Sequence, residues 1–555
     1  MELLTRAESS NYRETSRHSD VIAFVDALCQ QTSLVKKVSL GQSGEGQDMV
    51  AMIVSDERAF DPRTARKQKK MIVMVEANIH AGEVEGKEMV LALARDLTVG
   101  PLKRLGKKIL SRLCLVLIPD FNPDGNDRIS PKNRALDLAT LEGQVNPPGG
   151  AGTRYTGQGW NLNRDSMKQE AIETRNLAKF FRAWWPDMFI DCHTTDGSLH
   201  AFDLTYDTSH GNEALFSDFR ELNRDLLNRV ARQVEKRHGF RSTWYGNYVV
   251  EDDPTSGWHT YPALPRFGSH FRGLLGRIDV LLETYSYIDF ERRCHVIGAW
   301  LLELFRYAAH NSKALRHATA AEEAHIIARG ETPDPREMVG INYGVPRRDQ
   351  AGALAFDYPA HALDGDEVEI IAYDRKSLLA RQYPGKKERT YVVPHHRTFV
   401  PTIAVTTPVA YLVPEALVNK LEGHGIEYVR LEAEGQYVVD SYRVHAKEPT
   451  FSPDVAGVVP PPGEAEAPLS TKPPPKRFET VLAVTSERRT ATFPARTLYV
   501  PTAQRSGTLV VYLCEPMADD GLARWQFLDS MLEVGGWFPL HRVVEPAAFP
   551  KVKVE

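Results

Sequence analysis

Short apolar runs alternate with longer stretches of helical periodicity through residues 15–310 of the chain. Apolar side chains at helical spacing predict helices, and short apolar runs bounded by turn residues predict buried strands. The expected strands are residues 35–40, 49–54, 71–75, 113–119, 187–192 and 278–282, and the expected helices are residues 19–30, 168–184, 215–234 and 291–310. This alternation favours an α/β fold, with a mixed, largely parallel sheet sandwiched by helices. Ligands of such folds bind beyond the ends of the strands.

The pattern changes beyond about residue 330, where short β-type runs are separated by Pro and Gly turns. This pattern favours a β-sandwich-like accessory domain. A chain of 555 residues is long enough for about two to four domains, and we expect two, residues 1–325 and residues 326–555. Two proline runs, at residues 460–462 and 473–475, are expected to bracket an exposed excursion of the second domain.

Composition limits the classes of partner and compartment. Hydrophobic residues make up 42% of the chain and charged residues 25%, as in globular proteins. With 68 basic and 73 acidic residues the net charge is −5, which argues against nucleic acid or an anionic membrane as a partner. No apolar run reaches the roughly 18 residues of a membrane helix, and residues 1–8 lack the pattern of a signal peptide. As it stands the sequence predicts a cytoplasmic protein, or a secreted or periplasmic one if a leader has been removed.

The five cysteines form no Cys-x-x-Cys pair, so a disulfide framework and a thiolate zinc site are both disfavoured. Candidate metal ligands come instead from His and Glu. His80 and Glu83 follow the expected strand 71–75 and open a helical pattern, and a spacing of three would put both on one helix face, within reach of one ion. Taken alone, the pair also fits a solvated helix start.

A third candidate ligand, His193, ends the expected strand 187–192, and Glu283 ends the strand 278–282. Each has a plain structural alternative, a core histidine and a glutamate in a surface ion pair. Two His and one Glu are nevertheless the ligand set of catalytic zinc sites that leave one position open for water. Zinc lowers the pKa of such a water to about 7 and so supplies a nucleophile at neutral pH.

Five motifs follow one another in the order and rough separations of one known family. They are His80-x-x-Glu83, Asn122-Pro123-Asp124-Gly125, Leu162-Asn163-Arg164, His193 and Glu283. In this order the sequence resembles the zinc metallocarboxypeptidases, the carboxypeptidase A-like family, over about residues 15–310. The turn at residues 41–46 is similar to the early Gly-x-Ser-x-x-Gly hairpin of that family. The resemblance does not cover the remainder of the chain.

The resemblance implies a role for each matching residue. His80, Glu83 and His193 would bind one zinc ion per chain. Glu283 matches the catalytic glutamate of the family, which takes a proton from the zinc-bound water and passes it to the leaving amine. Burial at the end of an apolar strand agrees with this role, because desolvation shifts a carboxyl group towards acid/base use.

The resemblance also implies how a substrate is held. Asn163 and Arg164 match the pair that binds the terminal carboxylate, which suits a planar guanidinium next to an amide. Arg154 stands nine positions before Asn163, as in one variant of the family motif, and is expected to stabilise the oxyanion. Arg128 and Arg134 compete for that role, and a solvated surface position is the structural alternative.

Tyr261 and Asn161 are two further positions to which the resemblance extends. Tyr261 matches the mobile active-site tyrosine of the family by its distance from Glu283 alone, and core packing is an equal alternative. The family usually has Asp two residues before the carboxylate-binding Asn, where it accepts the second ring N–H of a zinc ligand. Here that residue is Asn161, an uncharged acceptor, so we expect weaker zinc retention than in relatives with Asp.

The sequence thus predicts a hydrolase, a zinc-dependent metallocarboxypeptidase that removes the C-terminal residue of peptides with a free C-terminus. One alternative is a zinc amidohydrolase of the aspartoacylase type, or a cell-wall-peptide hydrolase with the same ligand scheme. A second is an inactive binding module that retains the pocket, against which Glu283 argues because binding needs no base. Side-chain preference and oligomeric state stay open.

Overall fold

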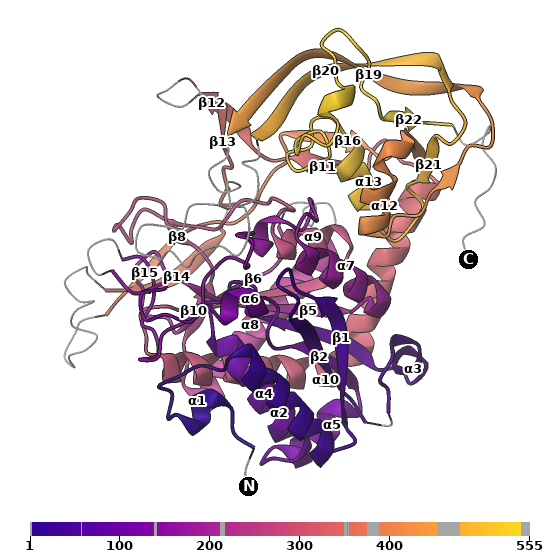
Figure 1. Ribbon diagram of the computed structural model, residues 1–555. Helices are drawn as coiled ribbons and strands as arrows, with labels where there is room; N and C mark the ends of the chain where they lie inside the picture. Colours follow the sequence, from indigo (N-terminus) through magenta and orange to yellow (C-terminus); the bar gives the residue numbers. More distant parts are fainter. Residues whose placement is uncertain are drawn as a thin grey trace.

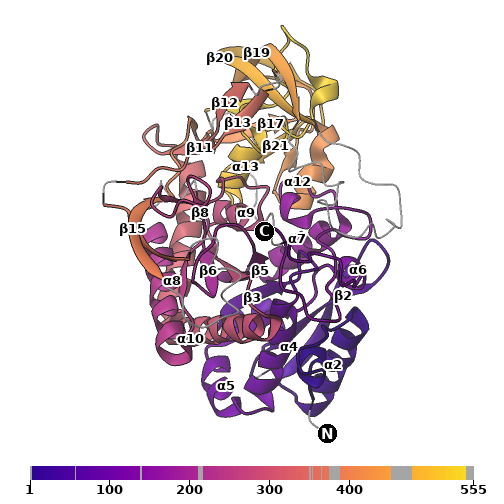
Figure 2. The same cartoon turned by 90° about the vertical axis from the view of Figure 1, so that its left-hand side faces the viewer.

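The computed structural model describes residues 3–545 apart from 57, 138–140, 211–216, 349–351, 353, 364, 374–387 and 452–477. The two proline runs at residues 460–462 and 473–475 lie outside the described residues. Figure 1 shows an α/β region built from the first part of the chain and a β-rich region built from the last part. In both views the β-rich region stacks on one end of the α/β region (Figures 1 and 2).

An eight-stranded mixed sheet forms the centre of the α/β region and confirms the predicted fold class. Its order is β1-β2-β4-β3-β5-β10-β6-β7. The strands are β1 (Val35–Gln42), β2 (Asp48–Val54), β3 (Met71–Ala77), β4 (Leu113–Ile118), β5 (Met188–Thr195), β6 (Leu204–Asp207), β7 (Ser242–Trp244) and β10 (Ile278–Tyr285). The neighbours β4, β3, β5 and β10 run parallel, whereas β1, β2 and β6 are antiparallel to their neighbours on the β4–β10 side. The parallel strands therefore end at one common edge.

Helices cover both faces because the central strands are apolar on both sides. In the fully buried β3, Val73 and Val75 face one core, and Ile72 and Met74 face the other. The first core packs against α2 (His18–Gln31), α4 (Glu85–Thr98), α5 (Lys103–Leu110), α8 (Ser217–His238) and α10 (Phe290–Glu331). The second packs against α3 (Pro62–Lys67), α7 (Ile172–Trp184) and α9 (Gly268–Leu274). Short helices are α1 (Arg6–Ser9), α6 (Pro123–Asn126) and the 3₁₀ turn Leu162–Arg164.

The predicted β-rich character of the C-terminal region is confirmed. Its largest sheet has six strands, β18 (Val429–Arg430), β21 (Leu498–Pro501), β17 (Ala410–Val413), β22 (His541–Val543), β19 (Gly435–Phe451) and β20 (Phe478–Phe493). Two smaller pairs are β11 (Met338–Asn342) with β16 (Ile403–Thr406) and β12 (Val345–Arg348) with β13 (Leu354–Asp357). The helical pieces are α12 (Val418–His424), α13 (Gly507–Cys514) and the 3₁₀ turns Glu415–Leu417 and Asp529–Met531.

The α/β region and the C-terminal region share one sheet and one hydrophobic core. The four-stranded sheet β14 (Glu367–Ala372), β15 (Arg389–His396), β9 (Trp258–His259) and β8 (Asn247–Tyr248) takes strands from both. The second core is also common, because α13 and β17 contribute to it together with α7. The predicted boundary between residues 325 and 326 falls within α10, and the division into two domains stays a prediction. Among the described helices, none combines the length and the apolar character that crossing a membrane requires.

Candidate metal centre and active site

The segment that carries His80 and Glu83 is a turn and not a helix, so that part of the sequence prediction is wrong. Asn78 directly after β3 has a positive φ of 69°, and α4 begins only at Glu85. The N–H of Glu83 donates to the carbonyl of His80 at 2.9 Å, which closes the turn. Proximity of the two side chains therefore comes from this turn at the strand end and not from helical spacing.

His80, Glu83 and His193 converge at the common edge of the sheet. Each offers a ligand atom within 4.8 Å of those of the other two. Glu83 bridges the histidines, with Oε1 at 3.0 Å from His80 Nδ1 and Oε2 at 2.9 Å from His193 Nδ1. All three are buried, with at most 3% exposure. The donor set and its closeness fit a divalent metal ion, and this cluster can hold one.

The charge of Glu83 suits it to be a ligand. Burial alone would raise the pKa of this carboxyl, but His80, Arg134 and His193 hold it well below its usual value. The pKa of His80 is lowered to about 3, first by burial and next by the charge of Arg154. A carboxylate beside a neutral imidazole is the protonation state in which both can bind a cation.

Glu283 lies beside this cluster through strand register. It is paired with His193 across the parallel strands β10 and β5, so both side chains leave the sheet on the same face. Burial is the largest influence on its carboxyl and, with the charge of Glu83, raises the pKa of Glu283 to about 8 against the opposing effect of His193. A carboxyl with this pKa can both take up and release a proton near neutral pH.

The three arginines that are candidates for stabilising the oxyanion differ in their neighbours. Arg154 Nη1 lies 3.7 Å from Glu83 Oε1, and Arg134 Nη2 lies 3.2 Å from the same oxygen. Arg128 instead pairs with Glu45 at 2.7 Å. The charge of Arg154 acts on both His80 and Glu283, whereas that of Arg134 acts on Glu83. Arg154 is thus the candidate arginine whose charge acts on both the metal-binding cluster and Glu283.

Asn163 and Arg164 lie in the 3₁₀ turn Leu162–Arg164. Asn163 Oδ1 accepts the N–H of Gly268 at 3.1 Å. Arg164 donates to the carbonyl of Asn163 at 2.8 Å, and its guanidinium carbon lies 4.4 Å from the centre of the Phe267 ring. The start of α9 therefore holds this pair on two sides.

Tyr245 is a candidate that the sequence analysis missed. Burial, then the charge of Glu283, raises the pKa of its phenol, and the neighbouring Thr195 and Arg164 oppose the rise. Tyr245 is therefore a protonated phenol within electrostatic range of both Glu283 and Arg164. Tyr261, the residue that sequence distance favoured, lies edge-on to Tyr245 at 5.4 Å and shares a 2.8 Å hydrogen bond with Ser269. No sequence pattern marked Tyr245, which follows the short edge strand β7.

The Nε2 atoms of the two histidines lie beside different residues. His80 Nε2 lies 3.3 Å from Asn161 Oδ1, so the amide takes the place predicted from the sequence. His193 Nε2 lies 3.1 Å from Asp191 Oδ1, a carboxylate that the sequence analysis did not single out. Asp191 is itself paired with Arg272 at 3.1 Å. A carboxylate therefore lies beside Nε2 of His193, and an amide oxygen lies beside Nε2 of His80.

One protein-family model matches part of the α/β region. Residues 21–263 match the family model described as zinc carboxypeptidase. The fold and the His80, Glu83 and His193 cluster thus define a zinc-carboxypeptidase-like region, and the resemblance seen in the sequence is confirmed over these residues.

Curated relatives cover part of the chain. Carboxypeptidase 2 of Trichophyton tonsurans is 24% identical over 184 residues, 33% of this chain and 29% of that protein. Carboxypeptidase 2 of Trichophyton rubrum is 22% identical over 223 residues, 40% of this chain and 36% of that protein. The matched part of the chain thus spans about a third of the length of these relatives.

Solved structures that match part of this chain include a metallo-carboxypeptidase from Burkholderia cenocepacia. It is 19% identical, covers 53% of this chain and 70% of its own, and has a TM-score of 0.38. A metallo-carboxypeptidase from Pseudomonas aeruginosa, solved in complex with (2-guanidinoethylmercapto)succinic acid, is 15% identical, covers 54% of this chain and 70% of its own, and has a TM-score of 0.38.

Proposed function

We propose that this chain is a zinc-dependent metallocarboxypeptidase that hydrolyses the C-terminal peptide bond of peptides with a free C-terminus. His80, Glu83 and His193 would hold one zinc ion. The observation that supports this most directly is the register of β5 and β10, which sets a candidate base, Glu283, beside a buried cluster of metal-binding character. The family match over residues 21–263 agrees with it.

A zinc ion held by His80, Glu83 and His193 would supply a Lewis acid for the scissile carbonyl and would lower the pKa of a bound water to about 7. The protein supplies the proton chemistry. Glu283 takes a proton from the attacking water and delivers it to the nitrogen of the leaving amino acid, a use that suits a carboxyl whose pKa is about 8. Arg154 contributes positive charge beside the carbonyl oxygen, where negative charge develops.

Residues other than the metal ligands and Glu283 would orient the substrate. Arg164 presents a planar guanidinium to the terminal carboxylate, and Asn163 adds an amide donor. The Oδ1 atom of Asn163 is occupied by the N–H of Gly268, which leaves its NH₂ group for the substrate. Tyr245, a protonated phenol within electrostatic range of Glu283 and Arg164, would be a further donor for the terminal residue.

The test is a digest of a peptide mixture by the full-length protein, read by mass spectrometry. We expect loss of single residues from the C-terminal end of free-acid peptides, no cleavage of the matching C-terminal amides, and loss of activity on chelation with recovery on adding zinc. N-acyl amino acids and cell-wall peptides belong in the same screen. Turnover of those alone would favour the amidohydrolase alternative, and binding without turnover would favour an inactive module.

A further inference from the structure

Arg266 connects the α/β region to the C-terminal region through a buried ion-pair network. Its Nε donates to Asp520 Oδ1 at 2.8 Å, its Nη1 donates to Glu479 Oε1 at 3.0 Å, and its backbone N–H donates to Asp520 Oδ2 at 2.7 Å. Its guanidinium carbon also lies 4.7 Å from the centre of the Trp525 ring. All four side chains are at most 3% exposed. Both the side chain and the backbone of Arg266 are therefore fixed by the C-terminal region.

The two residues after Arg266 contact the candidate carboxylate-binding pair. The Phe267 ring lies under the guanidinium of Arg164, and the Gly268 N–H donates to Asn163. The carbonyl of Arg266 accepts the N–H of Ser166, two residues beyond Arg164, at 3.4 Å. Residues 266–268, which we call the strap, thus contact the C-terminal region at one end and the segment 163–166 along their length.

We propose that Arg266 is a positioning residue through which the C-terminal region orients Asn163 and Arg164 for the terminal carboxylate of the substrate. This inference rests on the proposed function and assigns a role to the C-terminal region. Arg266 itself does not touch the substrate. The ion pairs of Arg266 hold the strap in place, and the strap in turn holds the side chains of Asn163 and Arg164 in place.

The chemistry of the network favours positioning over simple adhesion. A buried ion pair adds little net stability compared with apolar packing, but its hydrogen bonds have defined directions. Asp520 accepts from the backbone and the side chain of the same arginine, which restricts the rotation of the strap as well as its place. The second core already supplies apolar contact between the regions. What the network adds is orientation.

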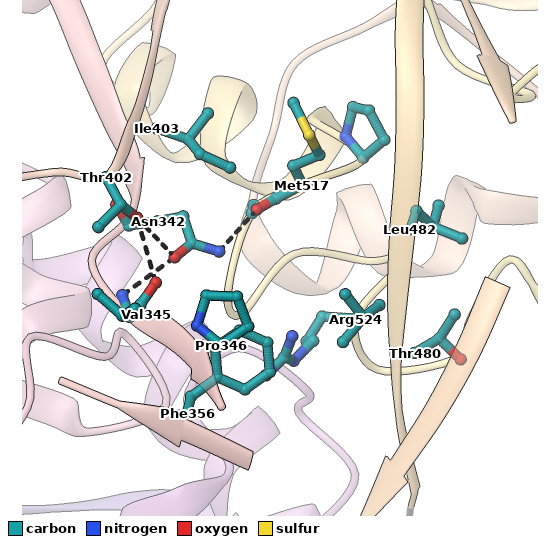
Figure 3. A pocket seen from close by; sticks show the side chains of 14 residues that line it. Asn342, Val345, Pro346, Phe356, Thr402, Ile403, Thr480, Leu482, Met517 and Arg524 are labelled. Carbon is teal, nitrogen blue, oxygen red and sulfur yellow. Dashed lines mark hydrogen bonds between the residues drawn. The ribbon is translucent and has the colours of Figure 1, made fainter. Parts of the chain in front are cut away.

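The network continues to the edge of a cavity in the C-terminal region. Arg524 donates to Glu479, lies over the Phe356 ring at 4.2 Å, and lines a cavity of about 320 Å³. Figure 3 shows Arg524 and Thr480 on one wall of the cavity. On another wall, Asn342 is hydrogen-bonded to Thr402 and Met517. Glu479 is thus shared between one arginine that belongs to the strap and one that lines the cavity.

The experiment compares three variants of the full-length zinc-loaded protein. Asp520→Asn weakens the anchor while keeping its shape, and Phe267→Leu removes the ring under Arg164 without touching the ion pairs. Glu515→Gln is the matched control, because Glu515 is an equally buried carboxylate of the same region whose partners are Tyr411, Tyr442 and Arg542. Melting temperatures establish that each variant is folded.

For a free-acid peptide, Asp520→Asn and Phe267→Leu should raise KM about tenfold and change kcat less than about twofold, since the pair binds the substrate before and during the reaction alike. Glu515→Gln should change neither. Equal effects of Asp520→Asn and Glu515→Gln, or a fall in kcat with KM unchanged, would overturn the proposal. Arg266→Lys, which keeps the charge but loses the fork, should fall between wild type and Asp520→Asn.

Hydrogen exchange separates this inference from the proposed function. The amide of Gly268 should exchange about tenfold faster in Asp520→Asn than in wild type or Glu515→Gln, because its bond to Asn163 depends on the strap. Unchanged exchange refutes the coupling whatever the activity. Faster exchange in a protein whose wild type cleaves no peptide refutes the carboxypeptidase function and with it the substrate role of the strap.

Discussion

His193 and Glu283 occupy paired positions on the neighbouring parallel strands β5 and β10. A candidate metal ligand and a candidate base therefore stand on one rigid sheet, and their separation is set by strand pairing rather than by loops. Sites built on strands hold their geometry more closely than sites built on loops. The role of Glu283 can accordingly be tested by changing its chemistry without changing its place.

Glu283→Gln keeps the shape of the side chain and removes its ability to accept a proton. We expect kcat to fall by about 10²-fold or more, with zinc content unchanged, because general base catalysis typically contributes about 10²–10⁴-fold. Turnover and metal analysis of the same preparation check both parts. A variant that keeps zinc and full turnover would exclude the mechanism proposed here.

Asn161→Asp should strengthen metal retention. The amide oxygen lies 3.3 Å from His80 Nε2, and a carboxylate there would increase the basicity of the ring more than an amide does. Such supporting residues typically change metal affinity by about 10–100-fold, so the variant should keep zinc at about tenfold higher chelator concentration. Chelator competition followed by metal analysis measures this. Equal loss of zinc from both proteins would contradict the prediction.

Arg154 and Arg134 can be separated by the property that each change alters. Arg154→Met should lower kcat by about 10²-fold with little loss of zinc, because the charge of Arg154 acts on the candidate base Glu283 and is proposed to stabilise the oxyanion. Arg134→Met should chiefly raise zinc retention, because it removes a positive charge that lies 3.2 Å from the ligand carboxylate of Glu83 and repels the ion. Arg128→Met is the control, since Arg128 pairs with Glu45 away from the cluster. The opposite pattern, with kcat dependent on Arg134, would move the oxyanion role to that residue.

The sequence predicted those parts of the site that depend on strand ends. Apolar runs such as those of β3 and β5 are buried on both faces and are therefore visible in the sequence, and polar residues within the last residues of the strands or just after them converge wherever the strands are parallel. His80, His193 and Glu283 were found in this way. The turn at His80 was not predicted as it is, because the residues before Glu85 fit a helical pattern although α4 begins only at Glu85.

The remaining residues of the site and its surroundings could not be predicted, because they are defined by contacts that no local sequence pattern indicates. Arg266 and Asp520 are 254 positions apart, and nothing around either residue in the sequence indicates its partner. Asp191 lies two residues before His193, on the same face of the strand, so the period of two could have indicated it. A strand buried on both faces, however, shows no alternation that would mark a polar residue as part of a site. Tyr245 follows a three-residue edge strand that has too few residues to show a period.

Glu322 provides a test of stability against pH that does not involve the metal site. This residue of α10 is 9% exposed, and burial raises the pKa of its carboxyl from the ordinary value of 4.5 to about 7, against the opposing charges of Arg329 and Arg277. The folded protein therefore binds this proton more tightly than the unfolded chain does. The contribution of this group to the free energy of unfolding is fully present below pH 4.5 and is lost as the pH rises to about 7.

Glu322→Gln removes that loss. The free energy of unfolding of the variant relative to wild type should rise between about pH 4.5 and 7 by up to about 3 kcal/mol and then stay level. Denaturant unfolding at several pH values measures the difference, in which other groups cancel. Glu331→Gln, at the exposed end of the same helix, is the control and should give a difference near zero throughout. A difference for Glu322→Gln that does not change with pH would show that this carboxyl is already ionised in the folded protein.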